Sequence, residues 1–202
     1  MYVARTAISW EPGMSITVRE YADADWHEIA RIHDAARLDE LRPTVGLDAF
    51  LDLEATYDGE GLFDGEVWMA EMDGRVTRFI AAANDEITWT YVDPAHYRQG
   101  VARAVLHHVL ARATAPIELE VLDGNDTARA AYESVGFVVT ETTTGKLAGN
   151  ESFVATGHTM RWEPAAREST ARMLIGGKAD LWSSDSWDVD PADLEVTDNE
   201  GR

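Results

Sequence analysis

Residues 118–137 read Glu-Leu-Glu-Val-Leu-Asp-Gly-Asn-Asp-Thr-Ala-Arg-Ala-Ala-Tyr-Glu-Ser-Val-Gly-Phe, and this stretch passes from a strand to a helix. Asn125 falls at the junction between the two, and Tyr132 falls on the helix. A second junction of the same kind, at residues 91–106, lies just upstream. Together the two junctions predict a single ligand site.

The strand of the downstream junction is predicted at 117–122, where apolar residues alternate with Glu118 and Glu120. Because side chains alternate across a strand, both glutamates point to the face opposite the apolar one. A helix is predicted at 128–135, and Gly136 suits the end of that helix.

The upstream junction contains a turn, Tyr97 to Arg103, between a strand and a helix. Gly100 and Ala102 are small and let the backbone come close to a ligand. The first N–H groups of a helix have no partner within the helix and lie at its positive end, an arrangement that holds a phosphate or pyrophosphate. Arg98 and Arg103 add positive charge for the same ligand.

The rest of the chain alternates between helical and strand periods, and the turns Asp73-Gly74 and Asn84-Asp85 divide an antiparallel meander. The order β-α-α-β-β-β-α-β-α-β-β predicts an α/β (α+β) protein with a central mixed, mostly antiparallel sheet. The predicted elements are strand 16–19, helices 25–41 and 47–57, strands 67–72, 75–83 and 87–92, helix 101–110, strand 117–122, helix 128–135, and strands 138–142 and 158–162 around a loop at 145–157.

The ends of the chain differ from its middle. Residues 1–13 have no clear period and are interpreted as an N-terminal extension, with Met14 as an alternative start. Residues 14–163 form the predicted domain, and residues 164–202 form an acidic C-terminal extension expected to be largely disordered. Its apolar residues, such as Trp182 and Trp187, are candidates for docking on the core or on a partner.

Composition limits the class of protein. A chain of 202 residues with 45% hydrophobic residues suits one globular domain, and it has no Cys, which excludes disulfides and thiol catalysis. The net charge of -20 disfavours nucleic acid and anionic membranes as partners, and it fits either a cationic substrate or a solubility or high-salt adaptation. With no apolar run long enough to span a bilayer and no signal-peptide core, a cytoplasmic location is expected.

The segment from Val92 to Leu106 closely resembles the acetyl-coenzyme A motif of the GNAT acyltransferases. That family's turn reads Gln/Arg-x-x-Gly-x-Gly/Ala, and Gly100 and Ala102 match its fourth and sixth positions. Tyr97 stands at the first position, where Gln or Arg is usual. Because main-chain N–H groups make most of the contacts to the cofactor in this family, we expect Tyr97 to change affinity or pantetheine contacts and to leave the binding mode intact.

The family's next motif is a strand followed by Asn, Ala, Tyr and Gly-Phe, and it matches Asn125, Ala128, Tyr132, Gly136 and Phe137. The resemblance implies a GNAT fold in which two neighbouring strands separate and pantetheine lies between them. It implies that Asn125 contacts pantetheine and that the Tyr132 hydroxyl lies near the thioester sulfur. The implied cofactor surface consists of Tyr91, Val92, Tyr97, Arg98, Gln99, Gly100, Val101, Ala102, Arg103 and Asn125.

Acetyl transfer to an amine requires a base for the amine and an acid for the leaving thiolate. Tyr132 is the candidate acid, and backbone N–H at the Tyr91-Val92 strand end can polarise the thioester carbonyl. Glu120 is one candidate base, because its Leu-Glu-Val placement twelve residues before Tyr132 resembles that of enzymes that acetylate the N-terminus of ribosomal proteins. Glu86, placed as in histone-type relatives, is the second candidate, and a water relay or no dedicated base is the third.

The acceptor amine is left open between a protein N-terminus, a polyamine and a small drug. The Leu-Glu-Val motif favours a protein N-terminus, and in this family the two N-terminal helices and the loop at 145–157 line the acceptor side. The charged residues expected there are Arg31, Arg37, Asp39, Glu40, Glu54 and Glu151. We expect a monomer or a homodimer.

Two other functions are considered. A non-enzymatic protein that binds acyl-coenzyme A as a sensor or interaction scaffold is the main alternative, and a toxin that acetylates aminoacyl-tRNA is disfavoured by the acidic charge. No metal site is expected, since His107 and His108 lack partners at ligand spacing on their helix. His96 is a candidate for a phosphate contact.

Overall fold

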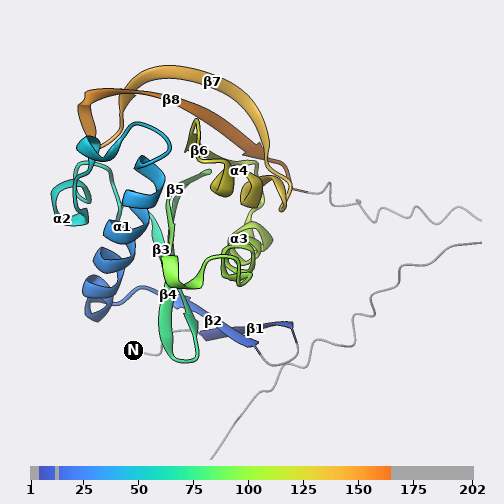
Figure 1. Ribbon diagram of the computed structural model, residues 1–202. Helices are drawn as coiled ribbons and strands as arrows, with labels where there is room; N and C mark the ends of the chain where they lie inside the picture. Colours follow the sequence, from blue (N-terminus) through green and yellow to red (C-terminus); the bar gives the residue numbers. More distant parts are fainter. Residues whose placement is uncertain (1–4, 12–13, 165–202) are drawn as a thin grey trace, which may run out of the picture. The chain divides into compact units, whose positions relative to one another are not determined.

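The computed structural model describes residues 5–11 and 14–164, with side chains from Ile16 onward. The strands form one eight-stranded sheet in the order β1-β2-β3-β4-β5-β6-β8-β7 (Figure 1). The strands are β1 (Arg5–Glu11), β2 (Met14–Glu20), β3 (Glu66–Met72), β4 (Arg75–Ala83), β5 (Glu86–Val92), β6 (Ile117–Leu122), β7 (Val138–Leu147) and β8 (Asn150–Trp162). The helices are α1 (Trp26–Leu41), α2 (Leu53–Thr56), α3 (Val101–Arg112) and α4 (Asp126–Glu133), with short 3-10 turns η1 (Asp23–Asp25), η2 (Leu47–Ala49) and η3 (Pro94–His96).

The sheet is mixed and mostly antiparallel, as the sequence predicted. Among the described strands, β5 and β6 alone pair in parallel, because α3 crosses from one to the other. The predicted meander β3-β4-β5 is confirmed, and its turns use left-handed backbone at Asp73, Gly74 and Asn84 (φ 52°, 76° and 57°). Residue types that tolerate positive φ therefore stand where tight hairpins need them.

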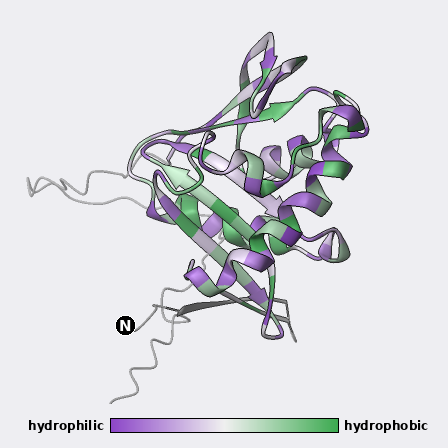
Figure 2. Cartoon of the chain, turned by 90° about the vertical axis from the view of Figure 1, so that its left-hand side faces the viewer, coloured by the Kyte–Doolittle hydropathy of each residue, from purple (hydrophilic) through white to green (hydrophobic). Residues whose placement is uncertain are grey.

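Helices cover both faces of the sheet, with α1 and α2 on one side and α3 and α4 on the other (Figure 1). On the α3 side, Ile80 and Leu106 belong to one buried cluster. On the α1 side, Ile29 and Phe79 belong to another. Consecutive residues such as Phe79 and Ile80 thus serve opposite cores, so the central strands are largely apolar in Figure 2.

The pairing of β4 with β5 contains one extra residue, and this bulge precedes the separation of β5 from β6. Ala81 pairs with Trp89 while Ala82 pairs with Ile87, so Thr88 is left over. Such a residue bends its strand and increases the local twist. The parallel pairing of β5 with β6 covers only Glu86–Glu118 and Ile87–Leu119. Beyond those two residue pairs the strands diverge toward their carboxyl ends.

The second predicted helix, 47–57, is wrong as a continuous element. The chain forms η2, passes through extended backbone at Phe50, and then forms the single turn α2. Ala49 is buried in a cluster with Leu41, whereas Leu53 is buried with Ile29. One helix cannot direct these side chains into two separate clusters, so the chain breaks between them, and the Asp52 carboxylate caps α2 by accepting from the Ala55 N–H (3.0 Å).

The predicted loop at 145–157 is also wrong. Most of it continues β7 and β8 as a long hairpin, with Lys146 opposite Val154 and Gly145 opposite Ala155. Leu147 is buried beside Leu41, which draws the hairpin toward η2. This buried contact at the tip stabilises the hairpin, so both strands extend further than the β-branched threonines alone would predict.

Residues 1–13, interpreted from the sequence as an N-terminal extension, include β1, which pairs antiparallel with β2 and adds an edge strand to the sheet. The predicted disorder and docking of the C-terminal extension concern residues that lie outside those described, apart from Pro164. None of the helices in the described residues is both long enough and apolar enough to traverse a bilayer.

Candidate active site

A cleft of about 1440 Å³ opens where β5 and β6 diverge. Of the predicted catalytic and cofactor-binding residues, Gln99 is the one that does not line it, and its side-chain amide instead donates to the Ala95 carbonyl (3.2 Å). The structure brings the rest together in its wall: Glu86, Tyr91, Val92, Tyr97, Arg98, Gly100, Val101, Ala102, Arg103, Glu120, Asn125 and Tyr132. Both junctions therefore border one cavity.

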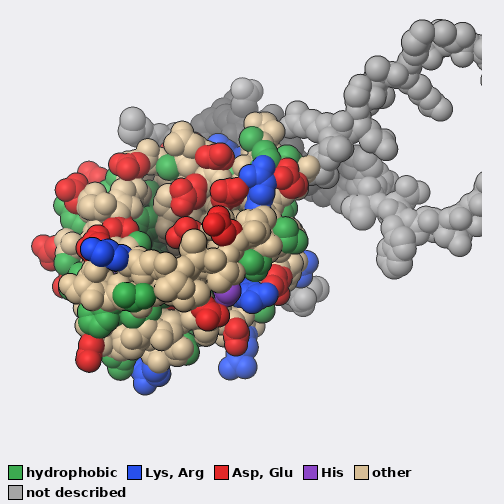
Figure 3. Space-filling view, turned by 90° about the horizontal axis from the view of Figure 1, so that it is seen from above, with side chains coloured by type: hydrophobic (Ala, Val, Ile, Leu, Met, Phe, Trp, Pro, Cys, Tyr) green, Lys and Arg blue, Asp and Glu red, His purple; other side chains and the backbone are tan. Residues whose placement is uncertain are grey.

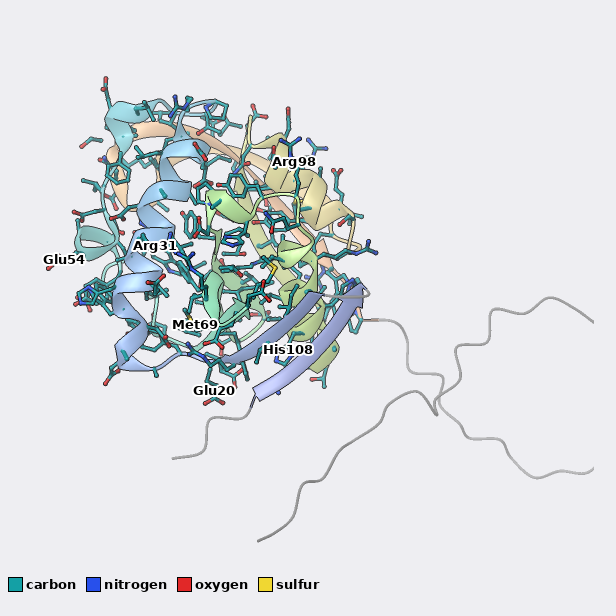
Figure 4. The ribbon with its side chains drawn as sticks, turned by 60° about the horizontal axis from the view of Figure 1, so that its bottom comes forward. Glu20, Arg31, Glu54, Met69, Arg98 and His108 are labelled. Atoms are coloured by element: carbon teal, nitrogen blue, oxygen red, sulfur yellow. The ribbon has the colours of Figure 1, made fainter. Side chains whose placement is uncertain are left out.

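The turn before α3 has the backbone needed to present N–H groups. Gly100 is the N-cap residue with φ 78°, and Arg98 has φ 59°, an uncommon conformation for a non-glycine residue. The first N–H groups of α3, those of Val101 and Ala102, have no carbonyl one turn behind them and remain available to an anion. Figure 4 shows Arg98 on this turn. The turn can hold a diphosphate.

Asn125 is fixed at the start of α4. Its side-chain oxygen accepts from the Ala128 N–H (3.2 Å) and caps the helix. The amide nitrogen donates to the Glu40 carboxylate of α1 across the cleft (3.4 Å). Because the oxygen is used for capping, the NH₂ group is the part of Asn125 that a ligand can reach.

Tyr132 is buried in the wall of the cleft, with 7% of its surface exposed. Burial raises the pKa of Tyr132 to about 12, while the positive charge of Arg78 lowers it and the negative charge of Glu40 raises it. Its ring packs edge-on against Phe137, with centroids 6.2 Å apart. The phenol is therefore protonated at neutral pH and held in place, as a proton donor must be.

The two candidate bases lie on neighbouring strands. Both Glu86 and Glu120 are exposed, and both line the cleft. Partial burial raises the pKa of Glu86, and the nearby charges of Glu120, Asp85 and Glu118 raise it further. The cleft thus holds interacting carboxylates at the point where the strands begin to separate.

Glu40 links the two walls of the cleft, and sequence reasoning assigned it no catalytic or cofactor role. Its carboxylate accepts from Arg37 Nη1 (2.7 Å), the Tyr91 hydroxyl (3.4 Å) and Asn125. Burial raises the pKa of Tyr91, and the negative charge of Glu40 adds to this effect. The sequence placed Glu40 among the acceptor-side charges. Its contact with Asn125 joins residues that are 85 positions apart, so no local pattern in the sequence indicates it.

The charges predicted on the acceptor side divide into two groups. Arg37, Asp39 and Glu40 line the cleft. Arg31 instead binds Asp93 (2.8 Å), and Glu54 lies on α2 at the outer side of the molecule (Figure 4). Like these two, Glu151 does not border the cleft. On the face seen in Figure 3, acidic side chains gather around a hollow.

The histidines occupy different surroundings. His96 lines the cleft, as a residue in reach of a bound phosphate would. His108 packs edge-on against Trp68 (centroids 5.0 Å apart), and among the described residues neither His107 nor His108 belongs to a group that could hold a metal ion.

Comparison with known proteins agrees with this geometry. Residues 63–139, from just before β3 to the start of β7, match the sequence model of a family described as an acetyltransferase (GNAT) domain. A search of curated proteins found no match.

Many solved structures share the fold. Among them are yncA of Salmonella typhimurium with its cofactor acetyl-coenzyme A (TM-score 0.55, 21% identity, covering 76% of this chain and 96% of that one) and the ribosomal-protein-S18-alanine N-acetyltransferase of Escherichia coli (TM-score 0.52, 20% identity, 83% and 99%). A third is the spermidine N-acetyltransferase of Vibrio cholerae in complex with coenzyme A and spermine (TM-score 0.54, 18% identity, 74% and 95%).

The separated parallel strands, the glycine turn and the buried tyrosine form a cleft of the kind that can hold a coenzyme A thioester. Residues 63–139 thus match a GNAT acetyltransferase domain, and the fold is shared with acetyltransferases such as yncA, which was solved with its cofactor acetyl-coenzyme A.

Proposed function

We propose that the protein transfers an acetyl group from acetyl-coenzyme A to a primary amine by direct attack in a ternary complex. The observation that carries this proposal is the cleft between β5 and β6, which both the α3 turn and the buried Tyr132 border. A single cavity can thus receive a diphosphate at one end and a thioester at the other, with the acceptor entering beside them.

The donor would be held mainly by backbone. The N–H groups of the turn at Gly100 to Ala102 would bind the diphosphate, with Arg98 and Arg103 adding charge. Asn125 would donate its NH₂ to pantetheine, and Tyr91 and Tyr97 would border the chain of the cofactor. Backbone N–H at the end of β5 would polarise the thioester carbonyl.

Glu120 is the base that we assign, with Glu86 beside it as the alternative. The amine must lose protons to form an amide, and a carboxylate at the edge of the cleft can accept one directly or through water. Tyr132 would give its proton to the departing sulfur. Asn125 and Tyr132 follow Glu120 along the chain at the junction of β6 with α4, so one short segment of the chain would carry these roles.

A peptide N-terminus is the acceptor that we propose. Asp39, Glu40, Glu86 and Glu120 line the cleft and favour a cationic substrate. The sequence Leu119-Glu120-Val121 with Tyr132 resembles the arrangement in enzymes that acetylate ribosomal-protein N-termini, and one neighbour in fold is named as such an enzyme. A polyamine is the second candidate, since another neighbour is named for spermidine.

The test mixes the full chain with acetyl-coenzyme A and a panel of amines and follows free thiol. The panel contains short peptides with different free N-termini, the same peptides with blocked N-termini, and spermidine. Thiol release with free but not blocked peptides is the expected result. Binding of acetyl-coenzyme A by calorimetry, with no thiol release from any amine, would contradict the activity and leave the binding scaffold.

A further inference from the structure

Arg78 is a buried cation in the wall of the cleft. It lies on β4 and shares the α3 side of the sheet with Ile80, and 1% of its surface is exposed. Nη1 donates to the carbonyl oxygen of Ala102 in the first turn of α3, and Nη2 donates to the Thr90 hydroxyl of β5. Arg78 therefore touches the two elements that form the cofactor side of the cleft.

Arg78 has no anionic partner among the described residues, although it is buried. Its Nε has no hydrogen-bond partner there, and no described carboxylate lies within ion-pair distance. Arg19 offers a contrast, because it is similarly enclosed on β2 and binds both Asp25 (2.6 Å) and Glu71 (2.7 Å). The fold can thus pair a buried arginine, yet at Arg78 it does not.

An unpaired buried cation lowers stability, because desolvation is not offset by a counter-ion. Accordingly, burial lowers the pKa of Arg78 to about 10. Arrangements that lower the stability of a fold are expected mainly at functional sites. The question is which anion the guanidinium faces during the reaction.

Tyr132 is the titratable group that interacts with Arg78. Around Tyr132, Arg78 approaches from β4, Glu40 from α1 and Tyr91 from β5, and of these only Arg78 carries positive charge. Arg78, Ala102 and Tyr132 all line the cleft. Arg78 and Tyr132 therefore share the wall of one cleft, and the positive charge of Arg78 acts on the proposed proton donor.

We propose that Arg78 is a positioning residue for thiol departure, which stabilises the negative charge that develops at the Tyr132 oxygen and the coenzyme A sulfur. The inference rests on the proposed acetyl transfer. In that step the amine nitrogen bonds to the thioester carbon and loses a proton to Glu120. The carbon–sulfur bond then breaks with its electron pair on sulfur, sulfur takes the Tyr132 proton, and the phenolate regains a proton through solvent. Thioester and amine become amide and thiol.

The first test replaces Arg78 by Met, which keeps much of the volume and removes the charge. Arg75→Met is the matched control, since Arg75 is an exposed residue of the same strand. We expect Arg78→Met to lower the single-turnover rate by about tenfold to a hundredfold, which is less than the roughly hundredfold to thousandfold loss of a direct oxyanion donor, because Arg78 acts through Tyr132. The calorimetric Kd for acetyl-coenzyme A should stay within a few-fold, and the melting temperature should not fall, because an unpaired charge has been removed.

The second test separates electrostatic help from a structural role. The donor is changed to the selenoester analogue of acetyl-coenzyme A, whose selenol is a stronger acid than a thiol and needs less help to leave. The rate defect of Arg78→Met should shrink with the selenoester and recover partly in Arg78→Lys. An equal defect with both donors, or a loss of rate explained by unfolding, would overturn the proposal.

The same experiments distinguish the two proposals. If the unmodified protein releases no thiol from either donor with any amine, the acetyl transfer itself fails. If it releases thiol and Arg78→Met does so at the same rate, only the role of Arg78 fails.

Discussion

At the scale of single residues, the site depends on charges placed around Tyr132. Arg78 and Glu40 act on its phenol with opposite sign, and burial dominates both. A phenol with a pKa of about 12 holds its proton until the sulfur becomes basic enough to take it. In the proposed reaction, Tyr132 would therefore act as an acid only late.

Replacing Tyr132 by Phe should slow turnover far more than it weakens cofactor binding. The ring and its packing on Phe137 are kept while the proton donor is lost. We expect kcat to fall about a hundredfold or more, as for loss of a general acid, with the Kd of acetyl-coenzyme A nearly unchanged. Tyr57→Phe, a change outside the cleft, is the control. Equal activity in both variants would remove Tyr132 as the acid.

Replacing Glu120 by Gln should slow the reaction and move its pH optimum upward. Without the carboxylate, only amine that has already lost its proton in solution reacts, and that fraction grows with pH. Rate–pH profiles of Glu120→Gln and Glu86→Gln are the measurement. Since the charge of Glu120 contributes to the raised pKa of Glu86, Glu120→Gln should also lower that pKa. An unchanged profile in Glu120→Gln would pass the role of base to Glu86.

The sequence could predict the residues of the two motifs, because their backbone roles impose residue types at fixed spacing. Gly100, Asn125 and Tyr132 follow from local order along the chain. Arg78 and Glu40 do not, since an arginine in a strand and a glutamate on a helix are ordinary surface patterns. Their roles depend on which face the bulged meander turns inward and on where the end of α1 meets α4.

At the scale of elements, the turn before α3 would determine how the diphosphate is held in the proposed complex. Gly100→Ala should weaken acetyl-coenzyme A binding, because a side chain at φ 78° is strained and relaxation would turn the N–H groups away. The strain is about 1–2 kcal/mol. Gly74→Ala is a matched control, with φ 76° and open space around it in the distant β3–β4 turn. Equal calorimetric Kd values for the two variants would contradict this role.

The start of α1 is tied to β2 by Arg19 and Asp25, through two short hydrogen bonds. The hydrogen bond from Arg19 lowers the pKa of Asp25 below its ordinary value of 3.8. Because the folded-state pKa is the lower one, the stabilisation is present above pH 3.8 and is lost as pH falls through the folded-state pKa.

Asp25→Asn should lower the free energy of unfolding at neutral pH by about 1.5–3 kcal/mol, the range for hydrogen bonds to charged groups. Urea unfolding measures it, with the exposed Asp23→Asn as control. The difference between Asp25→Asn and the unmodified protein should vanish in acid. A difference that persists at low pH would contradict the assignment.

Elements with a strong period were predictable, and those fixed by distant contacts were not. The alternating residues of β6 and the turn residues of the meander are local signals, so these elements can be placed from the sequence alone. The break at Phe50 arises because Ala49 and Leu53 enter separate clusters, and the full length of β7 and β8 depends on Leu147 reaching Leu41. No local window of sequence contains those partners.

At the scale of the whole molecule, ligand binding should stabilise the sheet where it is least paired. A ligand that binds the folded state alone adds about 2.7 kcal/mol to the free energy of unfolding at a hundredfold excess over Kd, and we expect this of coenzyme A. We expect the melting temperature to rise by roughly 5–10 °C. Acetyl-pantetheine, which lacks the nucleotide and diphosphate, should give a smaller shift. Equal shifts would indicate that the α3 turn does not hold the diphosphate.

The leftover Thr88 in β5 has a consequence for how this chain tolerates change in length. With that residue, Ile87 and Trp89 enter opposite cores although they are two positions apart. Deleting it would restore a regular ladder with Ile87 and Trp89 on their present faces, and it would remove the local bend and extra twist of the bulge. Insertions and deletions are usually confined to surface loops. Here the length of the strand itself matters, because a single extra residue distinguishes a regular ladder from the bulged one that precedes the separation of β5 from β6.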